Sequence, residues 1–302
     1  MKDKGSIFTG RSAVALGLLC TLMWSAAFPL IKVGMAEYAI AEGDTAAKML
    51  FAGVRFFLAG AAVCLFAMKK GERLAPESPG KMLHTVLFGL INTGVHYMCF
   101  YIGLSNSTGS RASIIEAMST FILITLSCAF FTDDRFDTMT ILGCILGIAG
   151  IVVINAGSES GRFTFSGDGV MLLSAVSSAA GGLYTRKALS GTSPYTATGI
   201  SMLTGGAALA LAGVLLGGRL TVLTPKGAVI MLALVSISAA AFGIYNKLLT
   251  CNPVSRIAIC NSLIPLMSVV LCCVFLGEAF DIRYIISGIL VCSGMTAVNA
   301  RR

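Results

Sequence analysis

The stretch RASIIEAMST at residues 111–120 is matched, 145 positions later, by RIAICNSLIP at residues 256–265, and this pairing decides the fold. At the same spacing Gly143 aligns with Gly288. A constant spacing that extends over an apolar run, a loop and a second apolar run indicates that one structural unit occurs twice in the chain.

Both copies of this unit consist of long apolar runs. The chain of 302 residues is 56% hydrophobic and only 12% charged, which departs strongly from the composition of soluble proteins. About 20 apolar residues are needed to cross a bilayer as a helix. We therefore expect an all-α polytopic membrane protein with ten transmembrane helices, built as two five-helix repeats over residues 1–157 and 158–302. The expected spans lie near residues 12–31, 49–68, 85–104, 112–131, 139–156, 169–185, 196–217, 227–249, 257–276 and 284–298.

An odd number of spans in each repeat places the two repeats in opposite orientations across the bilayer. Inverted repeats are common in secondary transporters, whose substrate site lies near the midplane between the two halves. The connections between the runs are short, so little of the chain remains outside the bilayer for a soluble catalytic domain. The pattern favours alternating-access transport of a small-molecule substrate, and we do not expect an enzyme.

The distribution of basic residues predicts the orientation. When the N-terminus is placed in the cytoplasm, most of the 22 lysines and arginines fall on the cytoplasmic side, as short loops require. We therefore expect a multi-pass protein of the inner (plasma) membrane with both termini cytoplasmic. Because the basic residues are scattered over many short loops, the net charge of +8 does not indicate a nucleic-acid partner.

No cofactor or metal is expected. The ten cysteines lie in or beside apolar runs without a CxxC pair, and the common nucleotide-binding and hydrolase motifs are absent. This argues against ATP-driven transport by the chain alone. Residues 133–137, DDRFD, spell a magnesium-diphosphate pattern, but the second acidic cluster that such chemistry needs is missing. We interpret them as a solvated loop or helix cap.

Glycines predict close helix packing. Most of the 34 glycines lie inside apolar runs, where small residues allow backbones to approach each other in lipid. The fifth and tenth spans are expected to be packing helices, and they are also the candidate surface for a homodimer. The glycines concerned are Gly143, Gly147, Gly150, Gly288 and Gly294.

Glu116 is the leading candidate for a functional residue, because charged groups at membrane depth are costly and usually face a cavity. Asn261 occupies the corresponding place in the second repeat, so we expect both side chains to face a shared interior. A carboxylate there can bind a substrate amine or carry a proton. The alternative is a structural salt bridge from Glu116 to Arg111, Arg55 or Lys32.

The third span carries further candidates for substrate binding. Asn92 and His96 are four residues apart and share a helix face, and His96 is either a proton-relay member or a hydrogen-bonded structural residue. Tyr97 and Tyr101 either line a pocket or anchor the helix at the interface. Asn246, in the eighth span, corresponds to Tyr101.

The first two spans complete the candidate site. Arg55 lies about two turns inside the second span and is suited to bind a substrate carboxylate. Trp24, the only tryptophan, lies mid-span, which favours a cavity wall over an interfacial anchor. Pro29 and Pro265 are the only prolines well inside spans and are expected to bend their helices as moving parts.

Several of these segments together resemble the drug/metabolite transporter superfamily, EamA type. The segments are residues 24–32 (WSAAFPLIK), residues 55–59 (RFFLA), Pro265, residues 276–278 (LGE) and Gly288. The resemblance covers essentially the whole chain. It implies a ten-helix transporter of small metabolites, often amino acids or related solutes, and frequently an exporter.

The chain departs from the family pattern at three places. Ser25 replaces a glycine, Thr120 stands where a proline is common, and Thr132-Asp133 replaces a Gly-Glu pair. The change at Thr120 weakens the expectation that both halves bend symmetrically. Two alternatives remain open: a membrane-embedded enzyme that modifies a lipid, and a solute-binding membrane protein that transports nothing.

Overall fold

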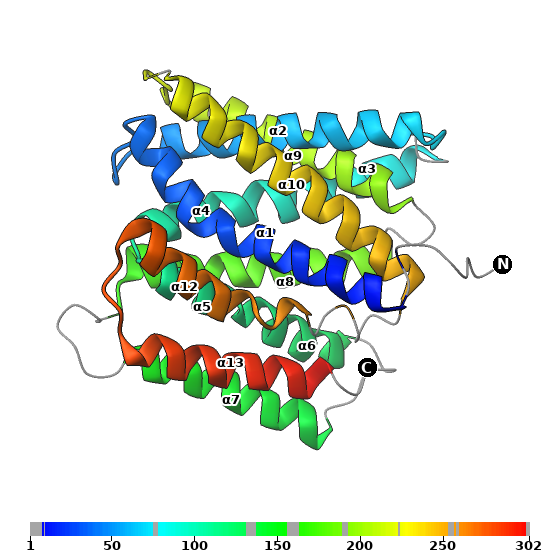
Figure 1. The fold of residues 1–302 in the computed structure, drawn as a ribbon. Helices are drawn as coiled ribbons and strands as arrows, with labels where there is room; N and C mark the ends of the chain where they lie inside the picture. The colour runs from blue at the N-terminus through cyan, green and yellow to red at the C-terminus, as the bar shows by residue number, and fades with distance from the viewer. Residues whose placement is uncertain are drawn as a thin grey trace.

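The computed structural model describes residues 8, 10–74, 78–130, 137–155, 163–188, 193–222, 224–252, 257 and 260–299. Within these residues every regular element is helical, and the helices run side by side along roughly one direction (Figure 1). The helices are α1 (Gly10–Glu37), α2 (Thr45–Lys69), α3 (Pro79–Gly89), α4 (His96–Ser105), α5 (Gly109–Glu116), α6 (Met118–Phe130), α7 (Thr138–Asn155), α8 (Val170–Ala188), α9 (Pro194–Leu215), α10 (Pro225–Cys251), α12 (Ile264–Leu276) and α13 (Ile282–Asn299). Two π-helical segments, Leu90–Val95 and Phe165–Gly169, precede α4 and α8.

The helices have the length and surface of membrane-spanning segments. Large apolar side chains face outward, as on α7, where Ile145, Ile148 and Val152 are each more than half exposed. Such a surface is stable when the surrounding solvent is lipid. Within the described residues, six stretches are long and apolar enough to cross a membrane, namely Arg11–Glu37, Thr45–Lys69, Pro79–Ser105, Gly109–Phe130, Pro194–Leu215 and Pro225–Leu248. Three shorter apolar helices are Thr138–Ile154, Ile264–Leu276 and Ile282–Val298. The chain is therefore a polytopic membrane protein.

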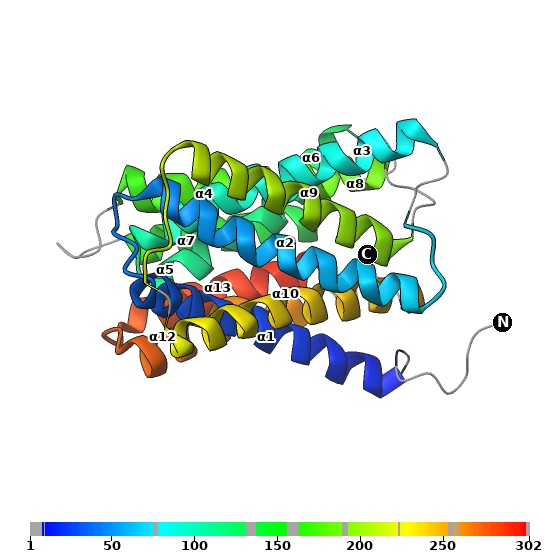
Figure 2. The same cartoon turned by 90° about the horizontal axis from the view of Figure 1, so that it is seen from above.

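The short helix α5 lies in the interior of the bundle. α1, α10 and α12 form one face, and α3, α4 and α8 lie on the opposite side (Figure 2). α5 lies between them and packs against both α12 and α8. α1 begins at the end of the bundle where α13 finishes (Figure 1). Residues at the end of α5 therefore point into the middle of the molecule.

Two expected spans are interrupted. α5 and α6 are separated by Ala117 alone, and a turn at Ser262-Leu263 comes directly before α12. Ala117 and Ser262 are separated by 145 positions, the spacing that relates the two matching stretches of the sequence. The first interruption forms although Thr120 replaces the proline, so this departure from the family pattern does not remove the break.

Pro265 interrupts its expected span, as a proline does to the turn before it, and its role as a moving part stays a prediction. Pro265 lies in the first turn of α12, where a backbone N–H has no helical partner and its absence costs nothing. The interruption comes before the proline. Pro29, in contrast, lies inside α1 as expected. Near it, the Ser25 hydroxyl donates to the carbonyl oxygen of Ile264 at 3.3 Å, which ties α1 to the beginning of α12.

α7 and α13 pack together through their glycines. A Cβ atom at Gly143 would collide with Val298 and with the carbonyl oxygen of Gly294. The backbone carbonyl of Gly150 accepts a hydrogen bond from the Ser287 hydroxyl at 2.5 Å. These glycine faces are therefore used inside one chain. A homodimer through these helices stays a prediction, and it would have to use their outer, apolar faces.

Gly143→Val is expected to destabilise the protein by about 1–3 kcal/mol, because the added atoms force α7 and α13 apart. The measurement is unfolding of the purified protein in detergent. Ile145→Val on the outer face of the same helix is the matched control and should change stability by less than about 0.5 kcal/mol. Equal stability of both variants would contradict the packing role.

Candidate functional site

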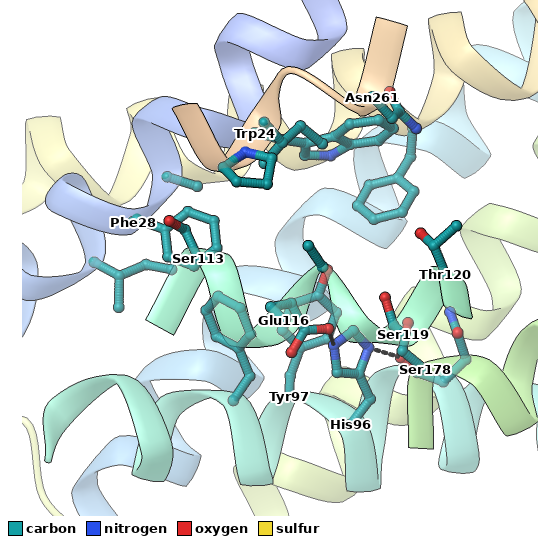
Figure 3. Close-up of a pocket in the computed structure, with 18 of the residues that line it drawn as sticks. Trp24, Phe28, His96, Tyr97, Ser113, Glu116, Ser119, Thr120, Ser178 and Asn261 are labelled. Carbon is teal, nitrogen blue, oxygen red and sulfur yellow. Dashed lines mark hydrogen bonds and ion pairs between the residues drawn. The ribbon is translucent and has the colours of Figure 1, made fainter. Parts of the chain in front are cut away.

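A cavity of about 260 Å³ lies where the two helix interruptions meet, and we call it the central cavity. Glu116, the last residue of α5, lies on one side, and Asn261 and Trp24 lie on the other (Figure 3). Its volume is close to the lower end of small-molecule sites, roughly 300–1,000 Å³. The predicted site residues that line it are Trp24, Arg55, Asn92, His96, Tyr97, Glu116 and Asn261, together with Pro265.

A second cavity of about 600 Å³ adjoins the central one. The two share the walls formed by Trp24, Asn92 and Asn261. The second cavity extends along the first turn of α9 towards the end of the bundle where α1 begins. Asn246 lines this second cavity rather than the central one, and its side-chain amide donates to the Thr198 hydroxyl.

Glu116 is bound to His96. The Nε2 atom of His96 lies 3.2 Å from Oε1 of Glu116 (Figure 3). The Ser174 hydroxyl donates to Oε2 at 2.8 Å. The side chains of His96 and Glu116 are 10% and 15% exposed, so both are largely buried yet reachable from the cavity. Ser174 on α8 was not predicted. A single serine in an apolar helix carries no signal of this role.

The π-helical segment before α4 orients His96. The backbone N–H of His96 bonds to the carbonyl oxygens of Ile91 and Thr93, not to the residue four positions earlier. The carbonyl oxygen of Asn92 is consequently available to the imidazole, whose Nδ1 lies 3.2 Å away. π-Helical turns of this kind often occur at functional sites. The sequence did not predict this turn.

Arg55 lines the central cavity as a buried cation. Its Nη1 donates to the Tyr101 hydroxyl at 2.8 Å, its Nε donates to Ser238 at 3.1 Å, and its guanidinium lies over the Phe56 ring. Among the described residues, no carboxylate pairs with it. Tyr101 is fully buried and lines neither cavity, so it positions Arg55 instead of forming part of the wall.

Trp24 forms an aromatic wall between the two cavities. Its ring packs edge-on against Phe242 and Tyr245, with centroids 5.2 and 5.0 Å apart. The indole Nε1 is buried and has no hydrogen-bond acceptor within the described part of the chain. A buried donor without an acceptor is costly. Trp24 thus combines an apolar surface with one unused donor.

The suggested salt bridge from Glu116 to Arg111, Arg55 or Lys32 is wrong. Arg111 instead forms a bidentate pair with Asp168, with Nε–Oδ1 and Nη2–Oδ2 distances of 2.8 Å. This acid lies in the π-helical segment before α8 and is only 1% exposed. The sequence carried a signal for it, an isolated acid at the start of an apolar run.

The end of the bundle away from the start of α1 is closed by contacts between distant segments. Glu278 accepts hydrogen bonds from the backbone N–H groups of Gly109 and Ser110, at 2.5 and 3.1 Å, and so caps α5. Gly277 ends α12 with φ of 64°, a left-handed conformation that favours glycine and turns the chain towards α5. Lys32 donates to the Ser107 carbonyl at 2.5 Å.

The acidic stretch at residues 133–137 is placed only in part. Asp137 accepts a hydrogen bond from the backbone N–H of Thr140 at 2.8 Å and caps α7, as expected for a helix cap. Asp133 and Asp134 lie outside the described residues. Among the described residues, no group of three histidine, cysteine or acidic side chains is arranged to hold a metal ion.

Comparison with known proteins identifies relatives along the whole chain. The model of the EamA-like transporter family matches twice, over residues 11–156 and 165–300. The uncharacterized transporter YvbV of Bacillus subtilis is 25% identical over 96% of this chain and 92% of its own length. A Salmonella typhimurium protein named "Probable amino-acid metabolite efflux pump" is 25% identical over 93% of this chain and 92% of its own.

Two further matches agree with these. The uncharacterized inner membrane transporter YedA of Escherichia coli K12 is 26% identical over 67% of this chain and 62% of its own length. A crystal structure superposes with a TM-score of 0.70 at 17% identity, covering 96% of this chain and 97% of that one, which shows a shared fold. These relatives are named as transporters or efflux pumps, which confirms the expectations of a transporter family and of a protein that is not an enzyme.

Proposed function

Because this chain belongs to the EamA-like transporter family, we propose that it is a secondary exporter of an amino acid or a related small solute across the inner membrane. It works by alternating access between two inverted five-helix repeats, residues 1–157 and 158–302, with ten spans and cytoplasmic termini. Three observations support this: the double family match, the two helix interruptions 145 residues apart, and the name of the Salmonella relative.

The buried charge of Arg55 is the observation from which we infer the chemical class of the substrate. A guanidinium in a membrane interior needs a counter-charge, and no described carboxylate supplies one. A substrate carboxylate can bind it with two parallel hydrogen bonds. Glu116 lines the same cavity, and its carboxylate is able to accept hydrogen bonds from a substrate ammonium group. A small zwitterion therefore matches both ends of the site.

The conformation of the structure matches the inward-facing step of the proposed alternating-access cycle. The end held by Glu278 and by the Arg111–Asp168 pair is closed, and the second cavity extends towards the other end. With both termini in the cytoplasm, the open end faces the cytoplasm. A protein in this state is ready to take up a solute from the cytoplasm for export.

Thermal unfolding in detergent, with and without candidate solutes, tests the proposal. A solute that binds only the folded protein stabilises it, by about 2.7 kcal/mol at 100 times its Kd. We expect stabilisation by one or more small zwitterionic amino acids, and none by nucleosides or polyamines at the same concentration. Stabilisation by polyamines alone would contradict the zwitterion assignment.

Arg55→Gln is expected to weaken binding of the stabilising amino acid by roughly 10–100-fold, because the charge-assisted hydrogen bonds proposed between Arg55 and the substrate carboxylate are lost. The amine analogue of that amino acid, which lacks the carboxylate, should bind the wild type and this variant with similar affinity. An equal loss for both compounds would show that Arg55 does not contact the carboxylate.

A further inference from the structure

The ring of His96 has one proton fixed by its surroundings. Its Nδ1 lies 3.2 Å from the backbone carbonyl oxygen of Asn92, and a carbonyl oxygen can only accept a hydrogen bond. The proton of that bond must therefore be on Nδ1. In a neutral imidazole the other nitrogen, Nε2, is then an acceptor.

Nε2 faces a second acceptor. It lies 3.2 Å from Oε1 of Glu116, whose other oxygen accepts the Ser174 hydroxyl. Two acceptors at this distance repel each other unless a proton lies between them. The contact is therefore satisfied only when the pair holds one more proton than a neutral imidazole and a carboxylate. Tyr97 stacks on the imidazole with a centroid distance of 4.4 Å, and its ring face favours the cationic form.

We propose that the His96–Glu116 contact is a proton-binding site whose proton is exchanged for the amine of the substrate. The exchange rests on the proposed function, whereas the proton site follows from the geometry alone. An ammonium group in the central cavity replaces the His96 N–H as the donor to Glu116. The imidazole becomes neutral and its proton passes to water, so one positive charge enters the site as another leaves it.

His96 and Glu116 share the described wall of the central cavity with few other charged or ionisable side chains. Arg55, from α2, stays charged at every accessible pH. On α4, Tyr97 lines the cavity and Cys99 lies buried nearby. The described wall residues from α1, α8, α10 and α12 carry no ionisable side chain; they are Trp24, Ala27, Phe28, Ile31, Ser178, Phe242, Ile264 and Pro265.

The proton site can be observed directly because the chain has only two histidines, His84 and His96. His84 is outside the cavity and bonds to the Tyr184 hydroxyl, so His84→Gln leaves one histidine to observe. Nitrogen-15 NMR of this variant in lipid nanodiscs at pH 7 should show Nδ1 protonated and Nε2 sharing a proton with Glu116. Adding Glu116→Gln should leave a neutral ring protonated at Nδ1 alone, because the amide N–H can donate to the neutral Nε2 and the amide has no negative charge to hold an extra proton on the imidazole.

Two NMR results would overturn the proton site. One is a neutral ring protonated only at Nε2 at pH 7. The other is a ring whose protonation between pH 6 and 8 is the same with glutamate and with glutamine at position 116. Transport does not enter either measurement, so failure of the proposed function leaves this result intact. Folding of each variant is checked by its thermal unfolding.

Trp24 reports on the exchange step, since it is the only tryptophan and lines both cavities. The probe is a mixture of the common L-amino acids without tryptophan, tyrosine and phenylalanine, whose own absorption and emission would mask the signal of Trp24. A change in Trp24 fluorescence together with loss of the Nε2 proton supports exchange. A fluorescence change with the proton retained overturns it. If neither the fluorescence nor the Nε2 proton changes, both the zwitterion substrate and the exchange are contradicted. The proton site itself is tested only by the NMR measurement.

Discussion

Glu116→Gln is expected to reduce transport by at least about 100-fold while the protein stays folded and inserted. The glutamine keeps the size of the side chain and its hydrogen bond to Ser174, but it loses the charge that binds the amine. Loss of charge-assisted hydrogen bonds worth about 1.5–3 kcal/mol each accounts for this magnitude. The measurement is uptake of the radiolabelled amino acid found in the stability screen, using proteoliposomes.

Glu37→Gln is the matched control for this change. Glu37 pairs with Lys226 at 2.8 Å at the end of α1, lies outside both cavities, and should leave transport close to wild type. Unchanged uptake by the Glu116 variant would rule out its role in substrate binding. Equal losses in both variants would indicate a general effect of removing a carboxylate.

Asp168→Asn is expected to lower the free energy of unfolding by about 3–5 kcal/mol. The substitution leaves the buried guanidinium of Arg111 without its counter-charge and weakens the hydrogen bonds that Asp168 accepts from Ser107 and from the backbone of Thr164. Denaturant or thermal unfolding in detergent measures the loss.

Two further variants separate this pair from a general charge effect. Asp281→Asn removes an acid whose pKa is lowered by hydrogen bonds from Arg283, but the pair is partly exposed, so stability should stay near wild type. The double change Arg111→Met and Asp168→Leu should recover much of the lost stability, because apolar groups of similar size often replace a buried pair at little cost. A stable Asp168→Asn protein would contradict the structural role of the pair.

Much of the architecture could be predicted from the sequence. The length of each apolar run indicates a membrane-spanning helix, and the constant spacing of matching residues indicates a repeated unit. The constant spacing also predicted that Glu116 and Asn261 face one interior, and both line the central cavity. The functional roles of these residues remain predictions.

The side-chain partners could not be predicted in the same way. Glu116 was expected beside a cation and lies against His96, while Arg111 binds Asp168. Such pairings depend on how each helix is rotated about its axis, and that rotation is set by packing against other helices. The π-helical turn before His96 changes this rotation locally. No residue pattern in that segment predicted the π-helical turn.

The short helix α5 also has a mechanical consequence. It has eight residues, so it is a rod about 12 Å long, with Glu116 at one tip and Gly109 at the other. Hydrogen bonds from Glu278 hold the Gly109 tip, and a single residue joins the opposite tip to α6. A helix resists compression along its axis, so any axial shift of Glu116 moves Gly109 by a similar amount. Binding of a solute beside Glu116 is therefore coupled, through this rigid helix, to the hydrogen bond between Gly109 and Glu278 at the closed end of the bundle.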